Sequence, residues 1–164
     1  VINGVGSAVF ADLARGEYFM YVEFGETEVF RGDAKNATVT VRGFETPLIV
    51  SYSTPVVITE NVTVTVVMDK DLTDNVTVTI DGYPSTKMVV AGKLVFDINA
   101  TYGEHNIAVG FKGNDKYYAA ENSTSFTVNK LDIDLSVGSD SVDYGEDLVV
   151  NVTTNEKFTG DLTV

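Results

Sequence analysis

The sequence predicts an all-β fold of tandem antiparallel β-sandwich repeats, and two observations lead to this prediction. Valine and threonine dominate, helix formers are sparse, and apolar residues alternate with polar ones in many short segments. In addition, one stretch occurs twice, because residues 16–41 reappear as residues 103–128 at a shift of 87 positions. A repeat of this length corresponds to one domain-sized β unit, so we expect more than one unit in the chain.

Each copy of the repeated stretch should form two alternating strands, joined by a turn that contains a glycine and an aromatic residue. A further hairpin is expected between 88–90 and 94–96, across Ala91-Gly92. Apolar side chains at every second position place one face of each strand on a core. The middle of the chain is therefore predicted to bury one set of alternating residues between two sheets: Val64, Val66, Val78, Ile107, Val109, Phe111, Phe126 and Val128.

The repeat divides the chain into three segments. Residues 43–129 should form one complete sandwich, because they contain about seven short strands separated by turn residues. Residues 1–42 match the C-terminal half of that unit, but they are too short to include a counterpart of its strand at 88–90. Residues 130–164 match the N-terminal half at a shift of 86, which aligns Leu135 with Ile49.

The two partial segments are expected to complete each other head to tail. Residues 160–164 align with 74–78, and residues 1–4 align with 79–82. The end of one copy would thus continue into the start of the next with no residue missing and none duplicated. We expect copies to join in this way, either as successive repeats of a longer chain or by strand complementation between subunits. An arbitrary segment boundary is the alternative.

The amino-acid composition disfavours several classes of binding partner. A formal net charge of −13 disfavours nucleic acid and anionic membrane surfaces, because both carry negative charge. The chain has no cysteine, so neither disulfides nor thiolate metal sites are possible. No apolar run is long enough to span a membrane. The acidity indicates a solvated, self-repelling surface, with cation binding or a saline exterior as the alternative.

The repeated stretch resembles a known family. Its second copy reads GEHNIAVGF, then GNDKY, then NSTSFTV, and this order is similar to the tandem immunoglobulin-like repeats of archaeal and bacterial adhesin-like cell-surface proteins, methanogenic archaea above all. The resemblance extends over essentially the whole chain. It implies immunoglobulin-like sandwiches in an extracellular stalk without catalytic residues or a cofactor. The first copy departs from the pattern, since GETEVF replaces the GNDKY turn, and antibody-type cysteines and tryptophan are absent.

Two residue classes are candidates for sites. Six Asn-x-Thr sequons are candidates for glycosylation, although strand composition by itself favours such triplets: Asn36, Asn61, Asn75, Asn99, Asn122 and Asn151. Acidic residues crowd the start of the third segment, where weak candidates for a Ca²⁺ site at a domain junction are Asp132, Asp134, Asp140 and Asp143. No EF-hand spacing accompanies these acids, so solvated loops are the favoured interpretation and no metal is expected.

No residue pattern predicts an enzyme. His105 is the only histidine and belongs to an inward-facing series, which indicates a half-buried structural role. Tyr117, with its counterpart Phe30, is expected to fill the core rather than to stack on sugars. Two functions from different classes therefore remain: a non-enzymatic repeat of a cell-surface stalk or filament that propagates head to tail, and an adhesion module that binds glycans or proteins of a host or neighbouring cell. A pocket lined by tyrosines and acids would favour binding, and smooth threonine-rich faces would favour the stalk.

Overall fold

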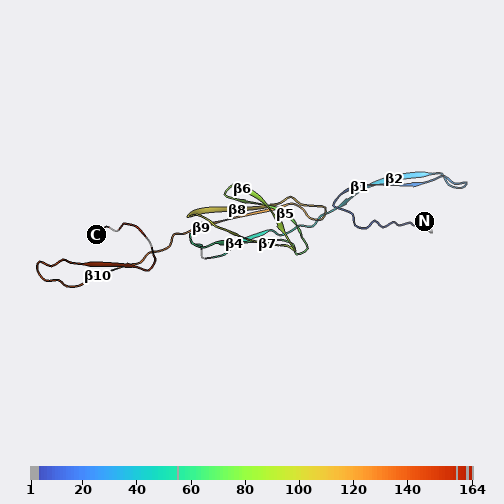
Figure 1. The fold of residues 1–164 in the computed structure, drawn as a ribbon. Helices are drawn as coiled ribbons and strands as arrows, with labels where there is room; N and C mark the ends of the chain where they lie inside the picture. The colour runs from blue at the N-terminus through green and yellow to red at the C-terminus, as the bar shows by residue number, and fades with distance from the viewer. Residues whose placement is uncertain (1–3, 55, 158, 162, 164) are drawn as a thin grey trace.

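The computed structural model describes residues 4–54, 56–157, 159–161 and 163. Eleven strands and no helix occur in this part of the chain, which confirms the all-β prediction. It follows that no described segment is a helix long and apolar enough to cross a membrane. The strands form three bodies in a row (Figure 1): the β1–β2 hairpin at one end, β3 to β9 in the centre, and the β10–β11 hairpin at the other end.

The central body is a sandwich of two antiparallel sheets. The smaller sheet has the order β3-β4-β7, formed by β3 (Ile49–Tyr52), β4 (Val62–Val67) and β7 (Lys93–Ile98). The larger sheet has the order β6-β5-β8-β9, formed by β5 (Asp74–Ile80), β6 (Tyr83–Val89), β8 (Gly103–Phe111) and β9 (Ala120–Val128).

The core lies between these two sheets. All eight residues that the alternation predicts to be buried are indeed buried, and none of them is more than 4 % exposed. Neighbouring strands contribute to it in register, since Val64 pairs with Phe96 across β4 and β7, and Val78 pairs with Val109 across β5 and β8. Burial of these valines and phenylalanines provides most of the stabilisation of the unit.

The predicted hairpin across Ala91-Gly92 is wrong. β6 instead pairs with β5 across the two-residue turn Asp81-Gly82, and β7 pairs with β4 in the opposite sheet. Both turn residues have positive φ, which suits a tight hairpin turn. The Val90–Lys93 bridge is the only pairing among the described residues between the two segments. The chain crosses between sheets here, and local alternation does not reveal which sheet a strand joins.

The first hairpin repeats the last hairpin of the sandwich. β1 (Gly16–Phe24) pairs with β2 (Asp33–Val41), and the register runs from Gly16 opposite Val41 to Phe24 opposite Asp33. Each pair, moved by 87 positions, coincides with a β8–β9 pair. Residues 4–15 contain no strand in the described part of the chain, so a counterpart of β7 is not formed there either, and the expected absence of a counterpart to 88–90 stays a prediction.

The second terminal hairpin repeats the opening of the sandwich, with one correction. β10 (Leu135–Ser139) pairs with β11 (Val150–Thr154), and Val137 lies opposite Val152 just as Val50 lies opposite Val66. Leu135 therefore corresponds to Leu48 and not to Ile49. The reason is that the stretch from Val137 to its partner Val152 is one residue shorter than the stretch from Val50 to its partner Val66. The join between residues 164 and 1 lies outside the described residues.

Candidate functional site

The candidate functional site is the apolar face that each terminal hairpin leaves uncovered. β1–β2 has the register of β8–β9, so Val22 occupies the position of Val109. Val109 is 1 % exposed because the opposite sheet covers it, whereas Val22 is 69 % exposed. Phe24 and Val39 are exposed in the same way, although their counterparts Phe111 and Phe126 are buried. The hairpin thus presents half of a sandwich core to solvent.

The β10–β11 hairpin presents the other half. Val150 occupies the position of Val64, because it lies opposite Ser139 as Val64 lies opposite Tyr52. Val64 is fully buried, whereas Val150 is 41 % exposed. Leu135 and Leu148 are also exposed on this hairpin. The two terminal hairpins therefore expose the two sets of positions that face each other inside the central sandwich.

A groove of about 590 Å³ lies on the first hairpin. The segment before β1 forms one wall, where the Tyr18 hydroxyl donates a hydrogen bond to the carbonyl oxygen of Ala14 at 2.7 Å. No charged side chain lines the groove, which suits it to an apolar partner. Its lining is Ala8, Phe10, Leu13, Tyr18, Phe19, Met20, Tyr21, Val22 and Val39.

The loop between β8 and β9, residues 113–118, is held in a fixed shape and is named here the clasp loop. Asn114 Oδ1 accepts a hydrogen bond from the N–H group of Tyr117 at 2.9 Å, and Asn114 Nδ2 donates to Asp74 Oδ2 at 2.9 Å. The Tyr117 ring is buried, as expected, and its hydroxyl donates to Asp69 Oδ1 at 2.8 Å. The Tyr117 side chain therefore pins the loop to the sandwich.

The carboxylates of this loop region are held in their charged form. The backbone N–H of Asp71 and then the Tyr117 hydroxyl lower the pKa of Asp69. The side-chain amide of Asn114 lowers the pKa of Asp74. Neither group holds a proton for general acid catalysis at neutral pH, so the acids that lie closest to the clasp loop stabilise its structure.

The clasp loop forms hydrogen bonds with the base of the first hairpin. The N–H group of Arg15 donates to the carbonyl oxygen of Asp115, and that of Phe44 donates to the carbonyl oxygen of Lys116, both at 2.8 Å. In addition, the N–H group of Tyr118 donates to the carbonyl oxygen of Phe44 at 2.9 Å.

The Arg15 guanidinium also lies over the Tyr118 ring, 5.2 Å from its centre. Arg15 Nε also donates a hydrogen bond to the carbonyl oxygen of Asn114, and the Lys116 ammonium lies 5.9 Å from the centre of the Phe44 ring. Backbone hydrogen bonds, one side-chain hydrogen bond and two cation–π contacts therefore hold the first hairpin and its linker to the clasp loop.

The junction was missed by the sequence reasoning. Arg15 and Tyr118 lie far apart in the chain, and neither belongs to a recognised motif. A signal was present in the alignment of the two copies, where Arg15 aligns with Tyr102 and Tyr118 aligns with Arg31. The arginine and the tyrosine exchange places between the copies, which indicates that these two positions contact each other.

His105 has the structural position that its place in the sequence predicts. Its side chain is 11 % exposed, and its ring stacks on Phe126 with centres 5.4 Å apart. Nδ1 lies 2.7 Å from Asp81 Oδ2, and Nε2 lies 2.7 Å from the carbonyl oxygen of Thr101. The hydrogen bonds with Asp81 and then with Thr101 raise the pKa of His105. Both ring nitrogens are engaged, so neither is free to bind a metal or a substrate.

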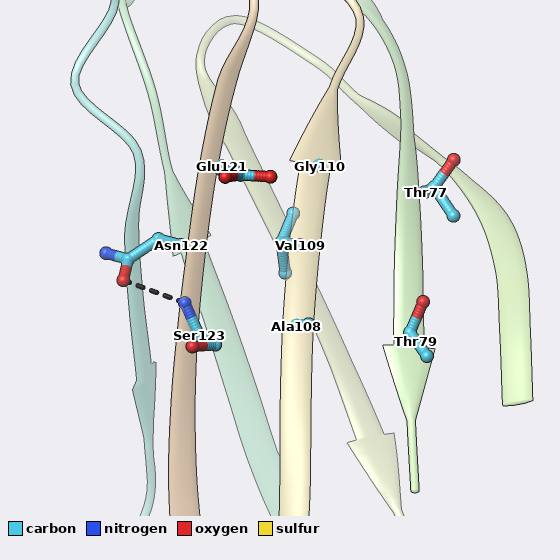
Figure 2. Close-up of a pocket in the computed structure, with 8 residues that line it drawn as sticks. All are labelled: Thr77, Thr79, Ala108, Val109, Gly110, Glu121, Asn122 and Ser123. Atoms are coloured by element: carbon cyan, nitrogen blue, oxygen red, sulfur yellow. Dashed lines mark hydrogen bonds between the residues drawn. The ribbon is translucent and has the colours of Figure 1, made fainter. Parts of the chain in front are cut away.

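The outer face of the larger sheet carries a shallow, open depression of about 620 Å³ (Figure 2). Gly110 and Ala108 of β8 form its floor, and Glu121 is its only titratable side chain. A single carboxylate supplies no acid–base pair, and no aromatic ring is present on which a sugar could stack. Two rows of paired residues make up the floor and sides: Thr77, Gly110 and Glu121, then Thr79, Ala108 and Ser123.

The six sequon asparagines are all exposed in the structure, from Asn36 to Asn151. Asn122 differs from the others because its Nδ2 donates to the carbonyl oxygen of Leu48 at 2.7 Å. Glycosylation itself stays a prediction.

The acidic candidates for a Ca²⁺ site are not brought together. Asp132, Asp134, Asp140 and Asp143 are exposed, and no group of three or more His, Cys, Asp or Glu suited to a metal ion occurs in the described ranges. Asp134 instead exchanges hydrogen bonds with Asn155, whose Oδ1 accepts from the Asp134 N–H at 2.9 Å. The geometry offers no ligand set for Ca²⁺ among these residues.

Comparison of the chain with protein-family models, with curated proteins and with solved structures finds no match. Its likeness to adhesin-like repeats is therefore a prediction that depends on the sequence pattern.

Proposed function

We propose that the chain is a non-enzymatic structural repeat of an extracellular cell-surface stalk, in which units propagate head to tail. The single observation that carries this proposal is the pair of uncovered faces, which expose at the two ends of the chain the positions that are buried in its centre. Soluble proteins rarely leave apolar faces of this kind open, because doing so forgoes hydrophobic stabilisation.

The strand order supports an immunoglobulin-like identity for each unit. A three-stranded sheet packed on a four-stranded sheet, seven short antiparallel strands in all, matches the general arrangement of immunoglobulin-like sandwiches. The last strand pair of the unit recurs in β1–β2 and the first pair recurs in β10–β11, so the same unit is represented more than once.

The linear arrangement of the three bodies supports a stalk (Figure 1). Each body adjoins only its neighbour in the chain, as in other repeat proteins, so length increases with each added unit. The outer face of the larger sheet is rich in threonine and small residues. This surface favours the stalk over the alternative, an adhesion module that binds glycans or proteins.

Two measurements test the proposal. Antibodies against the chain should label intact cells that produce the protein, and brief protease treatment of those cells should remove the label. Electron microscopy of the purified protein should show thin rods that lengthen with concentration. Labelling that requires permeabilised cells would overturn the surface assignment. Saturable binding on a glycan array by a protein that forms no rods would favour the adhesion module.

A further inference from the structure

The sandwich has, at its other end, residues equivalent to those that the clasp loop contacts at the observed junction. At the end of the sandwich near the third segment, Tyr102 takes the place of Arg15, Lys130 takes the place of Gly43, and Leu131 takes the place of Phe44. Tyr102 is 57 % exposed there, and the Lys130 ammonium lies 4.7 Å from the centre of its ring. This end of the sandwich therefore has the surface that a clasp loop would contact, and no clasp loop contacts it in the described structure.

The matching clasp loop lies at the opposite end of the chain. Residues 26–31 join β1 to β2, as residues 113–118 join β8 to β9. Arg31 occupies the position of Tyr118 on this loop, and it is exposed. Phe30 occupies the position of the buried Tyr117 yet is 66 % exposed, so the expectation that it fills a core is not met within one copy.

We propose that residues 26–31 of a second copy clasp Tyr102 and Leu131 of this chain, with Arg31 of one copy stacked on Tyr102 of the other. This inference depends on the proposed function, because it specifies the contact through which units join. At the observed junction the tyrosine, Tyr118, lies on the clasp loop, whereas at the proposed junction the arginine, Arg31, lies on it. The contact itself is conserved between the two junctions.

Backbone hydrogen bonds specify the register. In the observed junction, Arg15, Phe44 and Tyr118 bond through backbone groups, which do not depend on side-chain identity. The equivalent bonds at the new junction run from Tyr102 N–H to the Glu28 carbonyl, from Leu131 N–H to the Val29 carbonyl, and from Arg31 N–H to the Leu131 carbonyl.

The same docking covers both open faces. It brings the apolar face of β1–β2 of the second copy over that of β10–β11, as β8–β9 lies over β3–β4 in the sandwich. Val22 and Val150 then become core residues, and Phe30 fills the position of Tyr117. One chain cannot make these contacts by itself, because its two hairpins lie at opposite ends of the sandwich (Figure 1). A second copy is therefore the occupant.

A pair of complementary variants tests the contact. Tyr102→Arg places two arginines together, and we expect its self-association, measured by analytical ultracentrifugation, to be about tenfold weaker than that of the natural chain. Arg31→Tyr alone should weaken it about threefold, through loss of the cation–π contact. An equal mixture of the two variants re-forms an Arg–Tyr pair at every junction between unlike copies, so alternating association should return to within about twofold of the natural chain.

Matched controls separate this inference from the proposed function. The chain has no cysteine, so Arg31→Cys and Lys130→Cys introduced together should be the only site of cross-linking by a short bismaleimide, and only between copies. Asn36→Cys with Lys130→Cys, away from the clasp loop, should not cross-link. High salt should strengthen association, because both partial segments carry more Asp and Glu than Lys and Arg.

The outcomes are distinct. If both variants self-associate as strongly as the natural chain, or if cross-links form in another register, the Arg31–Tyr102 contact is overturned and head-to-tail assembly is not. A chain that stays monomeric at millimolar concentration and forms no cross-link would overturn both. Loss of association in each single variant and its recovery in the mixture would establish the contact.

Discussion

His105 and Asp81 form a close pair at the end of the sandwich, with Nδ1 and Oδ2 2.7 Å apart. The pKa of His105 is raised, first by the hydrogen bond with Asp81 and then by that with Thr101. The pKa of Asp81 is lowered, first by the N–H of Asn106 and then by His105. Both shifts favour the charged form of the group in the folded protein.

This pair predicts that the stability of the sandwich depends on pH. The His105 contribution is fully present below about pH 6.5 and is lost as the pH rises through the higher pKa of the folded state. The Asp81 contribution is present above about pH 4 and is lost as the pH falls through the lower pKa of the folded state. The pair should therefore stabilise the unit most between about pH 4 and 6.5.

Urea unfolding of the natural chain and of Asp81→Asn tests this prediction. The difference in free energy of unfolding between the two should be large at pH 5 and should shrink as the pH rises through the raised pKa of His105. Asp115→Asn, a change at an exposed aspartate, should give a small difference that does not follow this profile. A constant difference for Asp81→Asn across this range would contradict the assignment.

The equivalence of Val22 and Val109 predicts opposite mutational outcomes. Val109→Ala leaves a cavity in a closed core and should reduce stability by about 2 kcal/mol. Val22→Ala removes the same atoms from an open face and should cost less than about 0.5 kcal/mol in a dilute sample. Hydrogen exchange of the 103–111 and 16–24 peptides provides the local free energies of opening. Equal losses at both sites would show that the first hairpin is already covered.

Tyr117→Phe should raise the pKa of Asp69, because it removes the hydroxyl that donates to the carboxylate. The pKa should stay below its ordinary value, since the backbone N–H of Asp71 still donates to the same oxygen. Carboxyl-carbon NMR titration of Asp69 measures both effects. Tyr118→Phe is the control, and it should leave the Asp69 titration unchanged. No response to Tyr117→Phe would mean that the hydroxyl does not contact Asp69 in solution.

Glycosylation of the protein in its own host should appear as added mass on sequon peptides. Asn61 and Asn75 are exposed and should carry glycan, whereas Asn122 should carry least because its amide bonds to Leu48. Mass spectrometry before and after deglycosylation measures each site. Asn114, which is not in a sequon, should stay unmodified. Unmodified peptides at all six sequons would contradict the prediction.

The sequence predicts the strands and the core of this protein well, because both depend on alternation along a single strand. Val64 and Val109 are buried simply because every second residue of β4 and β8 faces inward. Alternation does not name the neighbouring strand, and for this reason β6 and β7 were wrongly joined as a hairpin. The one-residue offset at Leu135 has a similar origin, because only the observed pairing locates the shortened stretch.

The candidate site was less accessible from the sequence. The uncovered faces follow from the repeat and could be anticipated, whereas the contacts of Tyr117 and Arg15 join residues tens of positions apart and leave no local pattern. Such contacts emerge only when the loop between β8 and β9 is placed against the rest of the fold.

The ends of the sandwich determine how it bears load. Its chain enters at Phe44, which is bridged in parallel to Tyr117, and leaves at Asn129, which is bridged in parallel to Val57. These bridges lie at opposite ends of the unit, so a pull along the row slides the first strand segment lengthwise against the last. Their hydrogen bonds must then break together rather than one after another. We therefore expect the unfolding rate of the unit, rather than its equilibrium stability, to determine how long it stays folded under tension.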